Sequence, residues 1–93
     1  MKVSFEEKFI IALNNQVRYI SKDKPISSRK FKNELIKNLK KDLKSPYHFK
    51  KSRYYDDENI RDYVFKGYKV VIKVDIELET VSVVAILKHK NSL

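Results

Sequence analysis

Apolar residues recur at three- and four-residue steps in two consecutive segments of the chain, 6–21 and 25–44. This spacing places them on one side of an α-helix and predicts two amphipathic helices. The first stripe contains Phe9, Ile10, Leu13, Val17 and Ile20, and the second contains Phe31, Leu35, Leu39 and Leu43. An aspartate just ahead of a proline separates the segments and is typical of a helix start. The short connection predicts an antiparallel helical hairpin.

From residue 60 onward the period of the pattern changes to two, which indicates β-strands. Segments 60–65, 68–78 and 80–88 are rich in Val, Ile and Tyr, with turns expected at Gly67 and at 78–80. We predict a three-stranded antiparallel meander, with residues 1–5 as a first strand added at an edge and segment 45–59 as a loop. The predicted fold is α+β, in the order β-α-α-β-β-β, with the helical hairpin packed on an antiparallel sheet. The length fits one domain, 1–93.

Strict alternation along the strands assigns their side chains to two faces of the sheet. We expect the core to contain Leu13, Val17, Leu35, Leu39, Val70, Ile72, Val83 and Ala85. The other face receives cations and aliphatics together, namely Lys69, Val71, Lys73, Val84, Ile86, Lys88 and Lys90. This mixture suits either a groove for an amphipathic partner or a site for a phosphate backbone. The alternative is an ordinary half-exposed sheet with scattered aliphatics.

The charge balance narrows the choice of partners. The chain has 21 Lys and Arg against 12 Asp and Glu, a formal net charge of +9. An excess of this size favours polyanionic partners, meaning nucleic acid, a nucleoprotein assembly or an acidic protein. The alternative is a solvated, lysine-rich surface without a specific partner.

Several classes of site and of location are disfavoured by composition. The chain has no cysteine and two isolated histidines, so we expect no disulfide, no metal and no cofactor. No apolar run approaches the roughly 18 residues that would suggest a membrane span. Glu6 and Glu7 stand where a signal peptide would begin its apolar stretch. We therefore expect a cytoplasmic protein with no membrane partner.

The segment 59–75, "NIRDYVFKGYKVVIKVD", resembles a signature of the RelE/ParE superfamily of type II toxins, in which an Ile-Arg pair, a short turn and an aromatic–basic–aliphatic strand follow in order. The final "VSVVAILKHKN" is similar to the closing strand of that family. The upstream "RYISKDKPISSRKFKNELIKNLKKDL" looks like its helical hairpin. The resemblance covers nearly the whole chain.

The resemblance implies a toxin held inactive by an acidic antitoxin segment, but it leaves the target open. ParE-like members poison DNA gyrase, whereas RelE-like members cleave mRNA on the ribosome. Lys69 stands where the nucleases have an arginine, and no tyrosine follows Tyr68, so a gyrase poison is the leading hypothesis. A ribosome-dependent endonuclease is the alternative, and a non-toxic basic RNA-binding module is a second alternative.

Each hypothesis implies its own site residues. A nuclease would use Lys69, His89 and Lys90 in catalysis, although His89 could instead be structural. Target or nucleic-acid contacts are expected from Arg61, Lys69, Lys73, Lys88 and Lys90. Antitoxin contacts are expected from Val71, Val84 and Ile86. Arg61 has a structural alternative, an ion pair with the acidic segment 56–58.

Overall fold

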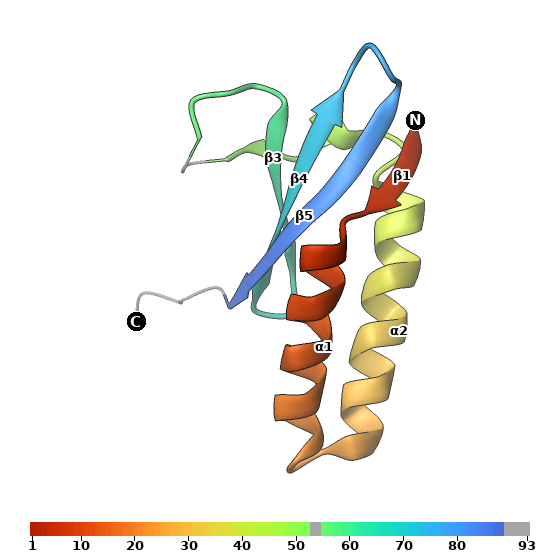
Figure 1. Ribbon diagram of the computed structural model, residues 1–93, viewed down its shortest axis with the longest axis vertical. Helices are drawn as coiled ribbons and strands as arrows, with labels where there is room; N and C mark the ends of the chain where they lie inside the picture. The colour runs from red at the N-terminus through yellow and green to blue at the C-terminus, as the bar shows by residue number, and fades with distance from the viewer. Residues whose placement is uncertain (53–54, 89–93) are drawn as a thin grey trace.

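The computed structural model describes residues 1–52 and 55–88 of the chain. Within these residues a helical hairpin lies on one face of a sheet (Figure 1). The helices are α1 (Glu7–Ser21) and α2 (Pro25–Asp42), followed by the 3₁₀ turn η1 (Pro46–His48). The strands are β1 (Lys2–Phe5), β2 (Lys50–Lys51), β3 (Ile60–Phe65), β4 (Tyr68–Asp75) and β5 (Thr80–Lys88). The predicted α+β fold class is confirmed, and neither described helix is long and apolar enough to cross a membrane.

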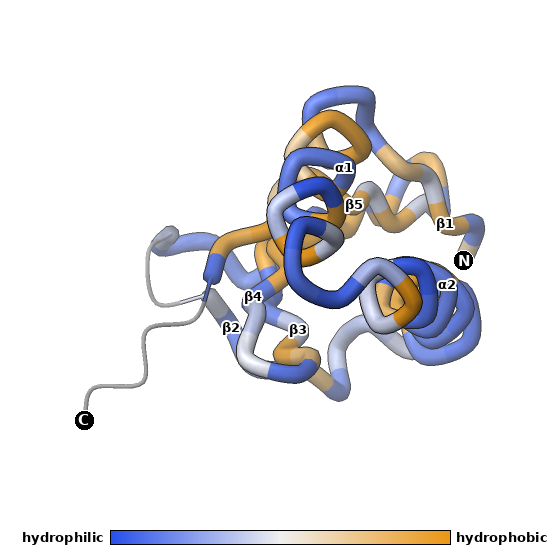
Figure 2. The backbone as a smooth tube through the Cα atoms, turned by 90° about the horizontal axis from the view of Figure 1, so that it is seen from below, coloured by the Kyte–Doolittle hydropathy of each residue, from blue (hydrophilic) through white to orange (hydrophobic). Residues whose placement is uncertain are grey.

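The two helices begin and end close to the predicted positions. Pro25 occupies the first turn of α2, where its fixed φ fits and its missing N–H would be unpaired in any residue. Both helices turn their apolar stripes toward the sheet, and Phe9, Leu13, Leu35 and Leu39 are completely buried. Figure 2 shows the same division, with hydrophilic positions on the outer side of α2. Burial of this stripe is the main source of helix stability in a domain of this size.

The sheet has the strand order β1-β5-β4-β3-β2 within the described residues. Strands β3, β4 and β5 form the predicted antiparallel meander. The sheet as a whole is mixed rather than antiparallel, because β1 pairs with β5 in parallel. A tight hairpin forces neighbouring strands to be antiparallel, but β1 and β5 are far apart in the chain and no hairpin constrains them. The two-residue strand β2 pairs with Asp62 and Arg61 of β3, in a segment predicted to be loop throughout.

The largest departure from strict alternation is a bulge in β5. The pairing passes from Val71 with Ala85 to Ile72 with Val83, so Val84 is an extra residue. One extra residue reverses the facing of every later side chain in the strand. The prediction that Ile86 lies outside the core is therefore wrong: it pairs with Val70 and is buried in the hydrophobic cluster under the helices.

The bulge also changes the facing of Ala85, which it turns away from the core. Ala85 was expected in the core, but it pairs with Val71 and is only half-buried. Val17 is also half-buried, packed against the edge of the core. The other six residues predicted for the core are buried: Leu13, Leu35, Leu39, Val70, Ile72 and Val83.

Candidate functional site

The turn between β3 and β4 determines which β3 side chains join the uncovered face of the sheet. Lys66 and Gly67 both have positive φ, 46° and 82°, as a two-residue hairpin turn requires. Because the turn contains only these two residues, Phe65 pairs directly with Tyr68. Val64 then lies beside Lys69, and Asp62 lies beside Val71.

The sheet face opposite the helices, which we call the outer face, consists of three rows of paired residues across β3, β4 and β5. The rows are Val64–Lys69–Leu87, Asp62–Val71–Ala85 and Ile60–Lys73–Ser82. Val84, at the bulge, is half-buried and lies outside the core cluster. The outer face thus contains a mixture of cations and aliphatics, as the alternation predicted, but Ala85 and Leu87 take the places expected for Ile86 and Lys88. The prediction that Lys88 lies on this face is wrong, because the bulge turns it to the face of its partner Tyr68.

A buried ion pair occupies the middle of the outer face. Lys69 Nζ lies 3.6 Å from Asp62 Oδ2, and the two side chains are only 11% and 8% exposed. Among the described residues, the other carboxylate oxygen of Asp62 has no hydrogen-bond partner. Lys69 was expected to be an exposed cation that meets a target. Lys69 is instead buried against the Asp62 carboxylate, so its role is to stabilise the outer face.

The exposed part of the outer face is aliphatic with a lysine at one side. Val64 and Leu87 flank Lys69 in one row and are 59% and 51% exposed. Lys73 is exposed four residues further along β4 than Lys69, whereas Val71 between them is buried. Neither Val64 nor Leu87 was among the site residues predicted from the sequence. A two-residue turn at Lys66–Gly67 would have revealed Val64, but only knowledge of the bulge could have revealed Leu87.

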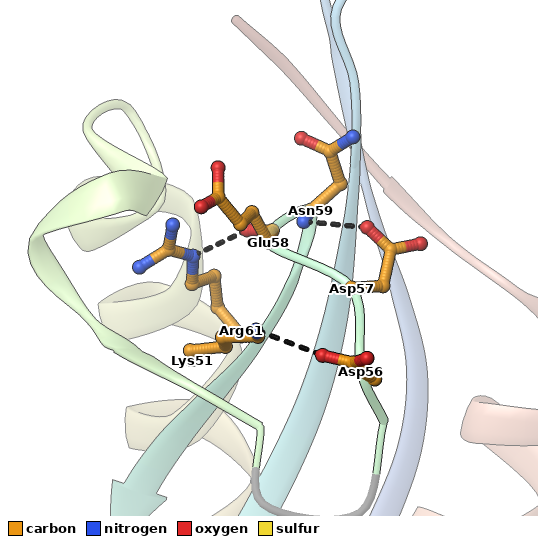
Figure 3. Close-up of polar contacts among 6 residues, drawn as sticks. All are labelled: Lys51, Asp56, Asp57, Glu58, Asn59 and Arg61. Atoms are coloured by element: carbon orange, nitrogen blue, oxygen red, sulfur yellow. Dashed lines mark hydrogen bonds and ion pairs between the residues drawn. The ribbon is translucent and has the colours of Figure 1, made fainter.

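Arg61 lies at the start of β3, paired with the core residue Ile72, so it points away from the outer face. Its Nε donates to the carbonyl of Glu58 at 2.7 Å (Figure 3), and its Nη1 donates to the carbonyl of Phe49 at 3.1 Å. The guanidinium also lies 5.0 Å from the centre of the Tyr47 ring. These contacts join η1 and the acidic segment to β3, which fits the structural alternative for Arg61, although its partners are carbonyls rather than carboxylates.

The acidic segment before β3 is organised by its own hydrogen bonds (Figure 3). Asp57 Oδ1 accepts from the backbone N–H of Asn59 at 2.8 Å, and Asp56 Oδ1 lies 3.2 Å from Lys51 Nζ. Asn59 in turn accepts a 2.7 Å hydrogen bond from the Tyr47 hydroxyl. Across residues 1–52 and 55–88, no group of three or more His, Asp or Glu is placed to hold a metal ion. These carboxylates shape the turn that leads into β3.

The remaining candidate residues lie at the end of β5. Lys88 pairs with Tyr68 and is exposed. His89 and Lys90 lie outside the described residues. The described outer face brings Lys69, Val71 and Lys73 together as predicted, and Val84 lies at the bulge, outside the core cluster. Arg61 and Lys88 lie on the opposite face, and Ile86 lies in the core.

Among the described residues, the chemistry of the outer face suits binding better than bond cleavage. Its exposed side chains are aliphatic or, at Lys73, a point charge. Desolvated aliphatics with a charged rim are the usual composition of a protein-docking surface. General acid–base chemistry needs a positioned group that exchanges a proton near neutral pH, and Asp62 is engaged with Lys69.

Comparison with known proteins identifies relatives of this fold. The family model described as ParE toxin of type II toxin-antitoxin system, parDE, matches residues 3–93. A structure titled as a chromosomal ParDE system from P. aeruginosa is similar over 97% of each chain, with 12% identity and a TM-score of 0.77. A structure of a mutant E. coli toxin RelE in complex with an antitoxin RelBc peptide is similar over 98% of this chain and 85% of that one, with 21% identity and a TM-score of 0.63.

The search of curated protein sequences gave no match. The two structural likenesses, at their low identities, establish the fold, while the family model covers nearly the whole sequence. The chain belongs to the ParE toxin family of type II toxin–antitoxin systems.

Proposed function

We propose that this protein is a growth-inhibiting toxin that poisons DNA gyrase in the cytoplasm and is neutralised by an acidic antitoxin bound to the outer face. Membership of the ParE toxin family supports the first part. The burial of Lys69 against Asp62 is the observation that favours gyrase over mRNA as the target. A nuclease of the RelE type would need this cation at the scissile phosphate, yet here its charge is already balanced by a carboxylate.

The exposed composition of the outer face supports the antitoxin part of the proposal. Val64 and Leu87 offer apolar area in the row next to the β3–β4 turn, and Lys73 offers a charge two rows away. An amphipathic acidic segment would bury its apolar residues against Val64 and Leu87 and place a carboxylate near Lys73. The related E. coli RelE structure contains an antitoxin peptide, which is consistent with neutralisation by a bound segment.

A growth test with inducible expression separates a toxin from a harmless RNA-binding module. If the proposal is correct, induction stops growth, and co-expression of the cognate antitoxin restores it. Plasmid isolated from the arrested cells should have lost negative supercoiling while a reporter mRNA stays intact. Arrest with normal plasmid supercoiling and cleaved mRNA would favour the nuclease alternative, and unimpaired growth would favour the RNA-binding module.

A further inference from the structure

The solvent side of α2 carries a row of cations that the outer face does not use. We define the α2 stripe as the residues Arg29, Lys30, Lys37, Lys40 and Lys41, all of which are exposed. The buried residues of the same helix, Ser28, Phe31, Leu35 and Leu39, lie on the opposite side. At 100° per residue the five cations fall within one third of the helix circumference. In Figure 2 the outer side of α2 is correspondingly hydrophilic.

The acidic residues of this helix do not neutralise the stripe. Segment 24–44 contains eight Lys or Arg and two acids, Glu34 and Asp42. Glu34 forms an ion pair with Lys66 of the β3–β4 turn, and this bond is the main cause of its lowered pKa, to which Lys30 and Lys37 add weakly. Asp42 accepts a hydrogen bond from Tyr63 on the sheet side of the helix. Both carboxylates therefore have their hydrogen-bond partners outside the stripe, and only Glu34 adds a weak charge interaction with Lys30 and Lys37.

Helix stability accounts for only part of the stripe. Lys40 and Lys41 lie in the last turn, where cations interact favourably with the helix dipole. The other end of the stripe gains nothing from the dipole, because Arg29 and Lys30 lie beyond the first turn of a helix that begins at Pro25. Lys37 also faces Lys40 and Lys41 at spacings of three and four residues, where like charges repel. The helix dipole thus accounts for Lys40 and Lys41 but not for Arg29, Lys30 and Lys37, and these three cations point to an external anion.

The shape and composition of the stripe identify the class of anion. From Arg29 to Lys41 the stripe is about 18 Å long, and a DNA duplex carries about ten phosphate charges over that distance. Ile26, in the first turn of α2, is 83% exposed at the N-terminal end of the stripe, but the described residues from Ser27 to Ser45 include no exposed large hydrophobic. A single aliphatic at one end is less than the apolar centre that a protein partner uses. The stripe also lacks the exposed aromatics on which single-stranded bases stack.

We propose that the α2 stripe binds the phosphate backbone of double-stranded nucleic acid without reading its sequence. Four of its five cations are lysines, which contact phosphate as point charges. This binding site is separate from the outer face and does not depend on gyrase being the target. It would hold the toxin on nucleic acid while the outer face remains available.

The test measures binding of fluorescently labelled duplexes of about 20 base pairs, longer than the stripe, over a range of salt concentrations. The variant K37Q/K40Q/K41Q removes three charges from the stripe. The control K2Q/K8Q/K50Q removes the same charge from exposed positions on β1, α1 and β2. All six positions are on the surface, and thermal unfolding of each variant checks that it folds. The stripe variant should be about as stable as wild type, because the loss of repulsion around Lys37 offsets the loss of the dipole contribution of Lys40 and Lys41.

We expect wild type to bind duplex DNA with affinity that falls steeply with salt, and the stripe variant to lose at least tenfold in affinity. The slope of log K against log salt should decrease by about 2 to 3 for the stripe variant, close to 0.9 for each lysine lost. The control should lose less than threefold. A duplex RNA of the same sequence shows whether the stripe prefers DNA or RNA. The duplex that binds more tightly is the one that the stripe takes.

Equal losses in the stripe variant and the control would show that net charge, and not the stripe, binds DNA, and would overturn the proposal. Absence of salt-dependent binding by wild type would also overturn it. Poly-L-glutamate serves as a protein-like polyanion. If it competes as well as duplex DNA at equal charge, the stripe fits an acidic protein instead and the proposal fails.

Discussion

At the scale of single residues, the buried carboxylate of Asp62 gives Lys69 a structural role. Asp62 and Lys69 are both buried in the middle of an otherwise half-exposed face. A buried charge is tolerated only when a partner compensates for its lost hydration. The pair therefore fixes the centre of the outer face on which Val64 and Leu87 stand.

We predict that Asp62→Ala lowers the free energy of unfolding by about 3 kcal/mol, because the Lys69 ammonium remains buried without this carboxylate. Urea denaturation measures the change. Lys73→Ala on the same face is the matched control, and its exposed side chain should contribute less than about 0.5 kcal/mol. Similar stabilities for the two variants would mean that the ion pair does not support the outer face.

Tyr63 connects the sheet to the end of α2 through a second polar contact. Its hydroxyl donates a 2.7 Å hydrogen bond to Asp42 Oδ2. Burial, followed by this hydrogen bond and the charge of Asp42, raises the pKa of Tyr63 above its usual value near 10. The folded protein thus keeps the phenol protonated at a pH where a tyrosine of the unfolded chain ionises. This contribution to stability is complete below about pH 10 and is lost as the pH rises toward the raised pKa.

Tyr63→Phe should lower the free energy of unfolding by about 1.5 to 3 kcal/mol near neutral pH, the range for a hydrogen bond to a charged group. The difference between wild type and variant should shrink above about pH 10, since only the wild type loses this contribution there. Unfolding curves at about pH 7 and pH 11 measure both values. A difference that stays constant over this range would contradict the assigned role of the phenol.

At the scale of secondary-structure elements, the bulge at Val84 determines the composition of both faces of β5. We predict that Ile86→Ala costs about 2 to 4 kcal/mol of stability through the cavity left in the core. Leu87→Ala should cost less than about 1 kcal/mol, since that side chain is half exposed. Strict alternation predicts the reverse order, so thermal or urea unfolding of these neighbouring variants decides the register.

Patterns that depend on local periodicity were readable from the sequence. The stripes containing Leu13 and Leu39 gave both helices, and the alternation around Val70 and Ile72 gave the central strand. The face of Ile86 was not readable, because one bulged residue shifts the phase of the strand and leaves no mark in the hydrophobic pattern. The pairing of β1 with β5 and of Asp62 with Lys69 depends on contacts between distant residues, which periodicity does not encode.

At the scale of the whole molecule, the cations are divided between two surfaces with different surroundings. Lys73 lies on the same face as the exposed aliphatics Val64 and Leu87, whereas the α2 stripe has a single exposed large aliphatic, Ile26, at its N-terminal end and none between Arg29 and Lys41. A protein partner and a phosphate backbone require these two different arrangements. The net charge of +9 thus fits an acidic antitoxin on one surface and nucleic acid on the other.

Binding of the cognate antitoxin should follow this division. Leu87→Asp should weaken the complex at least tenfold, mainly through faster dissociation, because it places a carboxylate among the exposed aliphatics of the outer face. Lys73→Ala should mainly slow association at low salt, and the stripe variant K37Q/K40Q/K41Q should bind almost as wild type. Surface plasmon resonance measures both rates. An antitoxin affinity that is unchanged by Leu87→Asp would place the antitoxin away from the outer face.

Supercoiling of relaxed plasmid by purified DNA gyrase tests the central claim most directly. We predict that the purified toxin inhibits supercoiling in a dose-dependent way, that equimolar antitoxin prevents the inhibition, and that the toxin leaves mRNA intact on translating ribosomes. Normal supercoiling at saturating toxin would contradict the claim if expression of the same protein still arrests growth. Ribosome-dependent cleavage of mRNA by that protein would then show that the family fold here carries a nuclease.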